Sequence, residues 1–151
     1  MGNDIISPDV ISEFRKIGTK SVFDPRKIFL ILDDLVPSRD ALSAEKNNVI
    51  ETFAKEQRID NFHEAGRAGI GHDFLPETGA VMPSDLIIGG DSHTCTYGAL
   101  GALAFGMGST DLAYCMAFDE IWVKVPPTLR FILRGKPPKW VGQKRPDTLC
   151  H

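Results

Sequence analysis

The chain has 151 residues, of which 42% are hydrophobic and 25% charged, and its net charge at pH 7 is −3. This length and composition are typical of a globular chain with room for one domain and a hydrophobic core. The interspersed, slightly acidic charge offers no basic surface for nucleic acid, and apolar runs such as IFLIL are too short to span a membrane.

In the first half of the chain, helix and strand patterns alternate. Residues 9–17 place their apolar side chains on one helical face, and Gly18 is a typical helix stop. Residues 27–32, KIFLIL, predict a strand that is covered on both faces. Residues 39–56 predict a second amphipathic helix.

The same alternation continues in the second half. Residues 85–89, DLIIG, predict another buried strand, and Ser-Thr-Asp at 109–111 predicts the N-cap of a helix over 111–119. Two further strands, at 121–125 and 128–135, are predicted near a sheet edge because a proline pair separates them. The order of elements predicts an α/β fold, a layered αβα domain with a largely parallel sheet.

The three cysteines, Cys95, Cys115 and Cys150, are odd in number and far apart, and no CxxC pair is present. A zinc site or cluster built wholly within this chain is therefore not predicted. Reduced thiols are typical of a cytoplasmic protein, and the first residues do not have the basic and apolar regions of a signal peptide. We expect a cytoplasmic location.

The stretch GDSHTCTYG, residues 90–98, follows the predicted strand at 85–89. In open α/β sheets, ligands bind beyond the carboxyl ends of the strands. Asp91 can fix the tautomer of His93 and raise its basicity, so the two form a candidate acid/base pair. Hydroxyls nearby can bind a polar ligand. From the residues alone, the alternative is a polar turn with a purely structural role, and no phosphate-loop or GxGxxG pattern decides between them.

The longer block GGDSHTCTYGALGALAFGMGSTDLA resembles the DSHT segment of the aconitase family, most closely the branch of 3-isopropylmalate dehydratase large subunits and their homoaconitase relatives. The segments FDPRKIFLILDDLVPSRD, SAEKNNVIETFAKEQRIDNF and FDEIWVKVPPTLRFILRGKPPKWV resemble the same family in order. The resemblance covers residues 3–142. It implies a fold that is part of the aconitase iron–sulfur domain.

The resemblance implies a hydro-lyase, which removes water from a small hydroxy-carboxylic acid and adds it back. For the dehydratase branch this reaction interconverts 2- and 3-isopropylmalate in leucine biosynthesis, and a homoaconitase- or aconitase-type substrate is the alternative. A [4Fe-4S] cluster is implied as the Lewis acid. A small, swivelling subunit is implied as the protein partner.

The resemblance also assigns site residues. His72, in GIGHDFLPE, matches a histidine that faces the site, Asp33 matches the acidic member of an Asp-His pair, and Asn3 matches the start of a substrate-proximal loop. The residues assigned in this way are, as catalytic, Asp91, His93, His72 and Asp33, and, as substrate-binding, Ser92, Thr94 and Asn3. No metal ligand is assigned.

The chain departs from the family pattern at several points. Asp34 and Asp73 stand where the family has histidine and glutamine, and both add negative charge beside a pocket for an anionic substrate. The family's cluster cysteines lie in a later CxxC segment that this chain does not contain. Cys95 and Cys115 match no ligand position, so we expect them to be ordinary thiols.

We expect residues 1–142 to form a partial, N-terminal aconitase-like α/β domain. The tail, residues 143–151, leaves the family pattern, and a family-like Asp-Leu-Ile-Leu reappears if an assumed coding sequence is read one nucleotide later. We therefore expect a frameshifted tail. Three interpretations stay open: part of a hydro-lyase completed by another polypeptide and inactive alone, a non-catalytic remnant, or a fragment that pairs with intact subunits.

Overall fold

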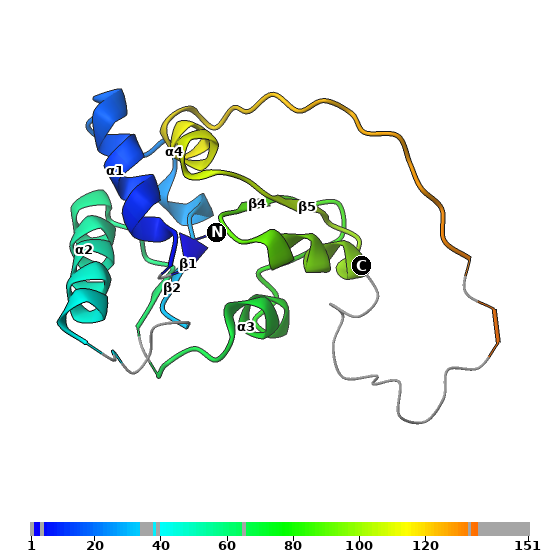
Figure 1. Cartoon of the computed structure of the whole chain (residues 1–151), viewed down its shortest axis with the longest axis horizontal. Coiled ribbons are helices and arrows are strands. Elements are labelled where there is room, and N and C mark those ends of the chain that lie inside the picture. The colour runs from blue at the N-terminus through cyan, green and yellow to red at the C-terminus, as the bar shows by residue number, and fades with distance from the viewer. Residues whose placement is uncertain are drawn as a thin grey trace.

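The structure is a computed structural model, and it describes residues 2–3, 5–33, 38, 40–64, 66–132 and 134–135. Helices and short parallel strands alternate along these residues (Figure 1). This arrangement confirms the α/β class that the sequence predicted. Asp34, Cys150 and the tail at 143–151 lie outside the described residues, and the predictions about them stay predictions.

The first two helices lie where the sequence predicted them. Helix α1 spans Ser7–Ile17 and helix α2 spans Ala41–Gln57. Gly18 ends α1 with a φ of 82°, a left-handed conformation that glycine adopts without steric cost. The helices pack on each other, and the rings of Phe14 and Phe53 meet edge to face with their centroids 5.5 Å apart.

Helix α4, Ser109–Phe118, packs on α1 and contributes to the larger core cluster. The predicted N-cap at 109–111 is wrong, because the N-cap position is Gly108 and no side chain caps it. The helix begins at Ser109, so the two hydroxyls lie inside its first turn. Asp111 also lies in the first turn, where a carboxylate is favoured by the helix dipole. None of the helices in the described part of the chain is long and apolar enough to cross a membrane.

In the described part of the chain, five short strands, all paired in parallel, form two sheets. The first sheet is ordered β1 (Gly2–Asn3), β2 (Leu30–Ile31) and β3 (Phe62–His63), and the second pairs β4 (Leu86–Gly89) with β5 (Leu103–Gly106). The predicted strand at 27–32 is shorter than expected, because Pro25–Lys27 forms a 3-10 turn, η1. The parallel pairing was predicted, whereas the division into two sheets was not.

Two elements that the sequence did not predict position the candidate site. Helix α3 spans only Gly71–Glu77 and contains Pro76, and η2 is a 3-10 helix over Ser92–Leu100. Beneath them lies a smaller core cluster. Its buried members are Ile31, Leu75, Val81, Tyr97 and Ala102.

The last described segment contradicts the sequence prediction. Residues 121–125 and the described residues of 128–135 contain no strand, and they run as an extended chain away from the body of the molecule after α4 (Figure 1). Trp122 and Phe131 are each 83% exposed. A strand needs a neighbour that pairs with its backbone, and the described residues place none beside this segment.

Candidate active site

The candidate site is the loop where β4 ends and η2 begins. Asp91 occupies the N-cap position of η2, and its side chain accepts a hydrogen bond from the His93 backbone N–H at 3.2 Å. Thr94 is fully buried, and its hydroxyl donates to the Asp91 carbonyl oxygen at 2.6 Å. The loop therefore fixes Asp91 through both its side chain and its backbone.

Two glycines let the neighbouring strands approach this loop. A Cβ atom on Gly106 of β5 would lie 2.5 Å from the Asp91 carbonyl oxygen. A Cβ atom on Gly89 of β4 would overlap the Thr94 hydroxyl. Real Cβ atoms do not come this close to other atoms. Both positions therefore require glycine, which has no Cβ atom. These contacts lock the Asp91 loop against both strands of the second sheet.

Asp91 joins two histidines from different elements. Its Oδ2 lies 2.7 Å from Nε2 of His72, which comes from α3, and its Oδ1 lies 3.1 Å from Nδ1 of His93, which comes from η2. The two imidazole centroids are 6.1 Å apart. The sequence predicted the Asp91–His93 contact and assigned His72 to the same network, and the structure brings the three side chains together. We call them the His72–Asp91–His93 cluster.

The contacts with Asp91 indicate which ring nitrogens of His72 and His93 donate hydrogen bonds. Partial burial works to raise the pKa of Asp91, but hydrogen bonds from the His72 ring and from the backbone and ring of His93 outweigh it, and the pKa lies below the ordinary value of 3.8. An ionised carboxylate only accepts hydrogen bonds, so His72 Nε2 and His93 Nδ1 are the donors. In the neutral rings, the lone pair is then on Nδ1 of His72 and on Nε2 of His93.

The two histidines differ in exposure. The His72 side chain is 16% exposed, and its Nδ1 is buried without a hydrogen-bond partner among the described residues. The His93 side chain is 57% exposed. His93 is therefore the ring that a molecule arriving from solvent can reach, with the Asp91 carboxylate behind it.

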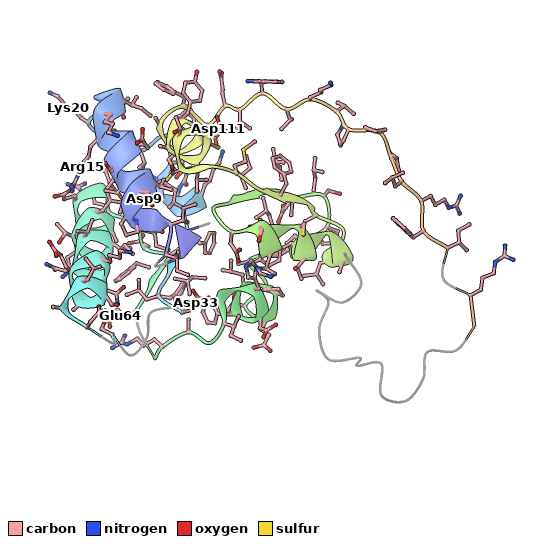
Figure 2. All side chains as sticks on the ribbon, in the orientation of Figure 1. Asp9, Arg15, Lys20, Asp33, Glu64 and Asp111 are labelled. Atoms are coloured by element: carbon pink, nitrogen blue, oxygen red, sulfur yellow. The ribbon has the colours of Figure 1, made fainter. Side chains whose placement is uncertain are left out.

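Asp33 lies at the start of α3. Figure 2 shows it between β2 and α3, and its Oδ2 accepts a hydrogen bond from the Gly71 N–H at 2.6 Å. A carboxylate is favoured there because the first N–H groups of a helix have no partner within the helix. Asp33 therefore accepts a hydrogen bond from the backbone of the residue that directly precedes His72 in the chain.

Tyr97 is a residue that the sequence analysis did not single out. It is completely buried, its hydroxyl donates to the Gly71 carbonyl oxygen at 3.4 Å, and its ring centroid lies 5.4 Å from that of His72. Burial, reinforced by nearby carboxylates, raises the pKa of Tyr97 well above its usual value, so the hydroxyl keeps its proton. Nothing in the sequence separates Tyr97 from an ordinary core aromatic, because Gly71 is 26 positions away.

A surface hollow of about 420 Å³ opens beside the cluster. Its lining consists of Ile5, Ile6, Asp9, Gly90, Asp91, Ser92 and His93. The volume is in the range of pockets that take small molecules. Among the described residues that line it, none is lysine or arginine.

The three residues predicted to contact the substrate, Ser92, Thr94 and Asn3, lie in different surroundings. Ser92 is exposed at the hollow, whereas Thr94 is buried and its hydroxyl turns back into its own loop. For Asn3, only the backbone in β1 is described. Substrate binding by these three residues stays a prediction. Asp73, which departs from the family pattern, is exposed in the first turn of α3.

The described cysteines do not fit an iron–sulfur cluster. The Cys95 thiol donates to the Ser92 carbonyl oxygen at 3.4 Å, and Cys115 lies half-buried in α4, where burial raises the pKa of its thiol. Both are free thiols. In the described part of the chain, no group of three or more His, Cys, Asp or Glu side chains could hold a metal ion.

The comparisons with known proteins agree on one family. The pattern of the aconitase family (aconitate hydratase) matches residues 1–145. The 3-isopropylmalate dehydratase large subunit of Acetivibrio thermocellus is 52% identical over 151 residues, which are 100% of this chain and 36% of that protein. The proteins of the same name from Moorella thermoacetica and Caldanaerobacter subterraneus subsp. tengcongensis are each 54% identical over 144 residues, 95% of this chain and 34% of theirs. The chain thus spans about a third of the length of these relatives.

Proposed function

The chain belongs to the aconitase family, and on that premise we propose that it supplies the histidine–carboxylate half of a hydro-lyase active site of the 3-isopropylmalate dehydratase type. The observation that carries the proposal is the double contact of Asp91 with His72 and His93 beside an open hollow. A cytoplasmic location is part of the proposal and is supported by the free thiols of Cys95 and Cys115.

Dehydration of a hydroxy acid needs a base that takes a proton from carbon and an acid that protonates the leaving hydroxyl. We assign removal of the proton from carbon to Nε2 of His93, because this ring is exposed and its Nδ1 already donates to Asp91. The acid that protonates the leaving hydroxyl is proposed to come with the part of the site outside these residues. When Nε2 takes the proton, the Asp91 carboxylate stabilises the imidazolium that forms. In the reverse direction the same nitrogen returns the proton.

The remaining assigned residues surround this transfer. His72 donates to the second oxygen of Asp91 and so keeps the carboxylate turned toward both rings. Ser92, exposed beside His93, is assigned to a polar group of the substrate. Asp33 is assigned to the site through α3, and Thr94 and Asn3 are proposed to contact the substrate from the edge of the loop and from β1.

The rest of the site is proposed to come from outside these 151 residues. Because the described lining of the hollow contains no lysine or arginine, we assign the groups that bind substrate carboxylates to parts of the enzyme outside these residues. The [4Fe-4S] cluster that the family uses supplies Lewis-acid chemistry when it is bound, and Cys95 and Cys115 do not fit it. We propose that the cluster ligands lie outside these 151 residues, with a small subunit as partner and an isopropylmalate-type acid as substrate.

The test is complementation. The chain is mixed with a polypeptide that carries the remaining two thirds of the Moorella thermoacetica large subunit, together with that enzyme's small subunit, and hydration of isopropylmaleate is measured. We expect turnover with the wild-type chain and a loss of about 100-fold or more with His93→Gln, in line with typical general acid–base contributions. Co-purification of the variant with its partners is the control. Equal turnover of His93→Gln and wild type would contradict the assignment.

The substrate alternative is a homoaconitase- or aconitase-type acid, which the same mixture tests with the corresponding unsaturated acids. The functional alternative is a non-catalytic fragment that pairs with intact subunits. The observation that favours it is the exposed apolar segment after α4, together with a groove of about 720 Å³ that includes residues of α1, α4 and β4 in its lining. Binding to an intact large subunit without any turnover would support this alternative.

A further inference from the structure

We infer that Tyr97 is a positioning residue: its hydroxyl and ring hold the first turn of α3 so that His72 Nε2 stays directed at Asp91. This inference deepens the proposed function, on which it rests for its catalytic meaning. Its geometry, however, does not depend on the identity of the substrate. Tyr97 itself touches neither the hollow nor solvent, because its side chain is completely buried.

The Gly71 residue is held from two directions. Its N–H donates to the Asp33 carboxylate at 2.6 Å, and its carbonyl oxygen accepts from the Tyr97 hydroxyl at 3.4 Å. Asp33 follows β2, and Tyr97 belongs to η2, so the two contacts come from separate parts of the fold. Because Gly71 directly precedes His72, this Asp33–Gly71–Tyr97 clamp sets the backbone from which the His72 ring projects.

The helix needs such a clamp, because it is weak on its own. Helix α3 has seven residues, and its N-cap residue, Ile70, provides no side-chain hydrogen bond. Isolated helices of this length are not stable in water. Pro76 has no N–H, so the hydrogen bond that residue 76 would donate to the His72 carbonyl oxygen cannot form. The helix therefore restrains His72 less than a regular helix would.

The Tyr97 ring adds a second restraint. It belongs to the smaller core cluster and lies tilted against the His72 imidazole, with their centroids 5.4 Å apart and their planes at 42°. Leu75, one turn along α3 from His72, belongs to the same buried cluster as Tyr97. A rotation of His72 away from Asp91 would have to move this packed ring, which costs contacts on both sides.

The experiment observes the His72 imidazole by nitrogen-detected NMR in the full chain, without substrate or partners. In the wild type we expect a protonated Nε2 and a slowly exchanging Nε2–H signal, because this proton is shared with Asp91. Tyr97→Phe keeps the ring and removes the hydroxyl. We expect it to lose the protected Nε2–H signal of His72 while the chain stays folded. Tyr114→Phe, on a half-exposed tyrosine of α4, is the matched control and should leave the signal unchanged.

A Tyr97→Phe chain with lower stability but an unchanged His72 signal would overturn the inference, since it would give Tyr97 a merely structural role. If Tyr97→Phe does not fold, the other arm of the clamp gives the answer. Asp33→Ala should lose the His72 signal, and Asp33→Asn, which keeps an acceptor for the Gly71 N–H, should restore it. Equal signals in both Asp33 variants would overturn the inference. Failure of complementation with these signals intact would instead count against the proposed function.

Discussion

His72 and Asp91 lie 19 residues apart in the chain, and Nε2 of the histidine meets Oδ2 of the carboxylate at 2.7 Å. This contact links α3 to the loop after β4, two parts of the fold with no strand pairing between them. The other carboxylate oxygen, Oδ1, lies 3.1 Å from Nδ1 of His93. One ionised group thus orients a partly buried imidazole, His72, and an exposed one, His93, and the account of the site depends on it.

The first prediction concerns pH. Since the pKa of Asp91 in the folded chain lies below its ordinary value of 3.8, the unfolded chain binds this proton more readily than the folded chain. The stabilisation is therefore complete above pH 3.8 and is lost as the pH falls through the lower, folded-state pKa. The stability advantage of wild type over Asp91→Asn, taken from the free energy of unfolding at each pH, should decrease as the pH falls below this value. A difference that does not change with pH would contradict the prediction.

The second prediction concerns the close approach of β5 to the loop. In Gly106→Ala, the new methyl group would lie 2.5 Å from the Asp91 carbonyl oxygen, so the backbone has to shift. We expect a loss of about 1–3 kcal/mol in the free energy of unfolding, the usual cost of overpacking. Gly98→Ala is the control, because a Cβ atom there meets nothing within 4 Å. Equal stability of the two variants in urea denaturation would count against the role of Gly106.

The third prediction concerns the packing of α1 on α2. Phe53 is 1% exposed and meets Phe14 edge to face. Phe53→Ala should lower the free energy of unfolding by about 3–5 kcal/mol, because it leaves a cavity in the larger core cluster. Phe23, which is 58% exposed, is the matched control, and Phe23→Ala should cost much less. Similar losses in both variants, measured by chemical denaturation, would show that the core does not lie where described.

The fourth prediction concerns the exposed segment after α4. Leu129 is 79% and Phe131 is 83% exposed, and apolar surface of this kind drives association. The double variant Leu129→Ser, Phe131→Ser should reduce concentration-dependent association in light scattering. Leu42→Ser, at an isolated exposed leucine of α2, should have little effect. An unchanged association in the double variant would place the contact surface elsewhere.

The sequence was most informative where structure depends on near neighbours. The apolar spacing in 9–17 and the glycine after it led to the first helix, and the Asp91–His93 contact spans two residues. The strands predicted at 121–125 and 128–135 are wrong because an apolar, β-branched run forms a strand only with a partner, which composition does not supply. Helix α3 was missed because GHDFLPE has a glycine, a proline and no helical period.

The candidate site was predictable only where its contacts join residues that are close in the chain. His72 was found only through the family resemblance, since no local pattern connects it with Asp91. Tyr97 was missed altogether, because its contact with Gly71 arises from the packing of η2 on α3. Thr94 was grouped with Ser92 as a substrate contact, although its hydroxyl forms a loop hydrogen bond that depends on the closeness of Gly89. Such contacts need the three-dimensional arrangement.

The most direct test of the central claim, that this chain carries the histidine–carboxylate half of a site and not the cluster half, is anaerobic iron–sulfur reconstitution of the purified chain. Visible absorbance and hydration of isopropylmaleate are read from the same sample. The account predicts no cluster spectrum and no turnover with the chain alone, and both on addition of the polypeptide with the remaining two thirds of the large subunit together with the small subunit. A cluster spectrum with turnover in the chain alone would contradict it and would require Cys95, Cys115 or Cys150 as ligands.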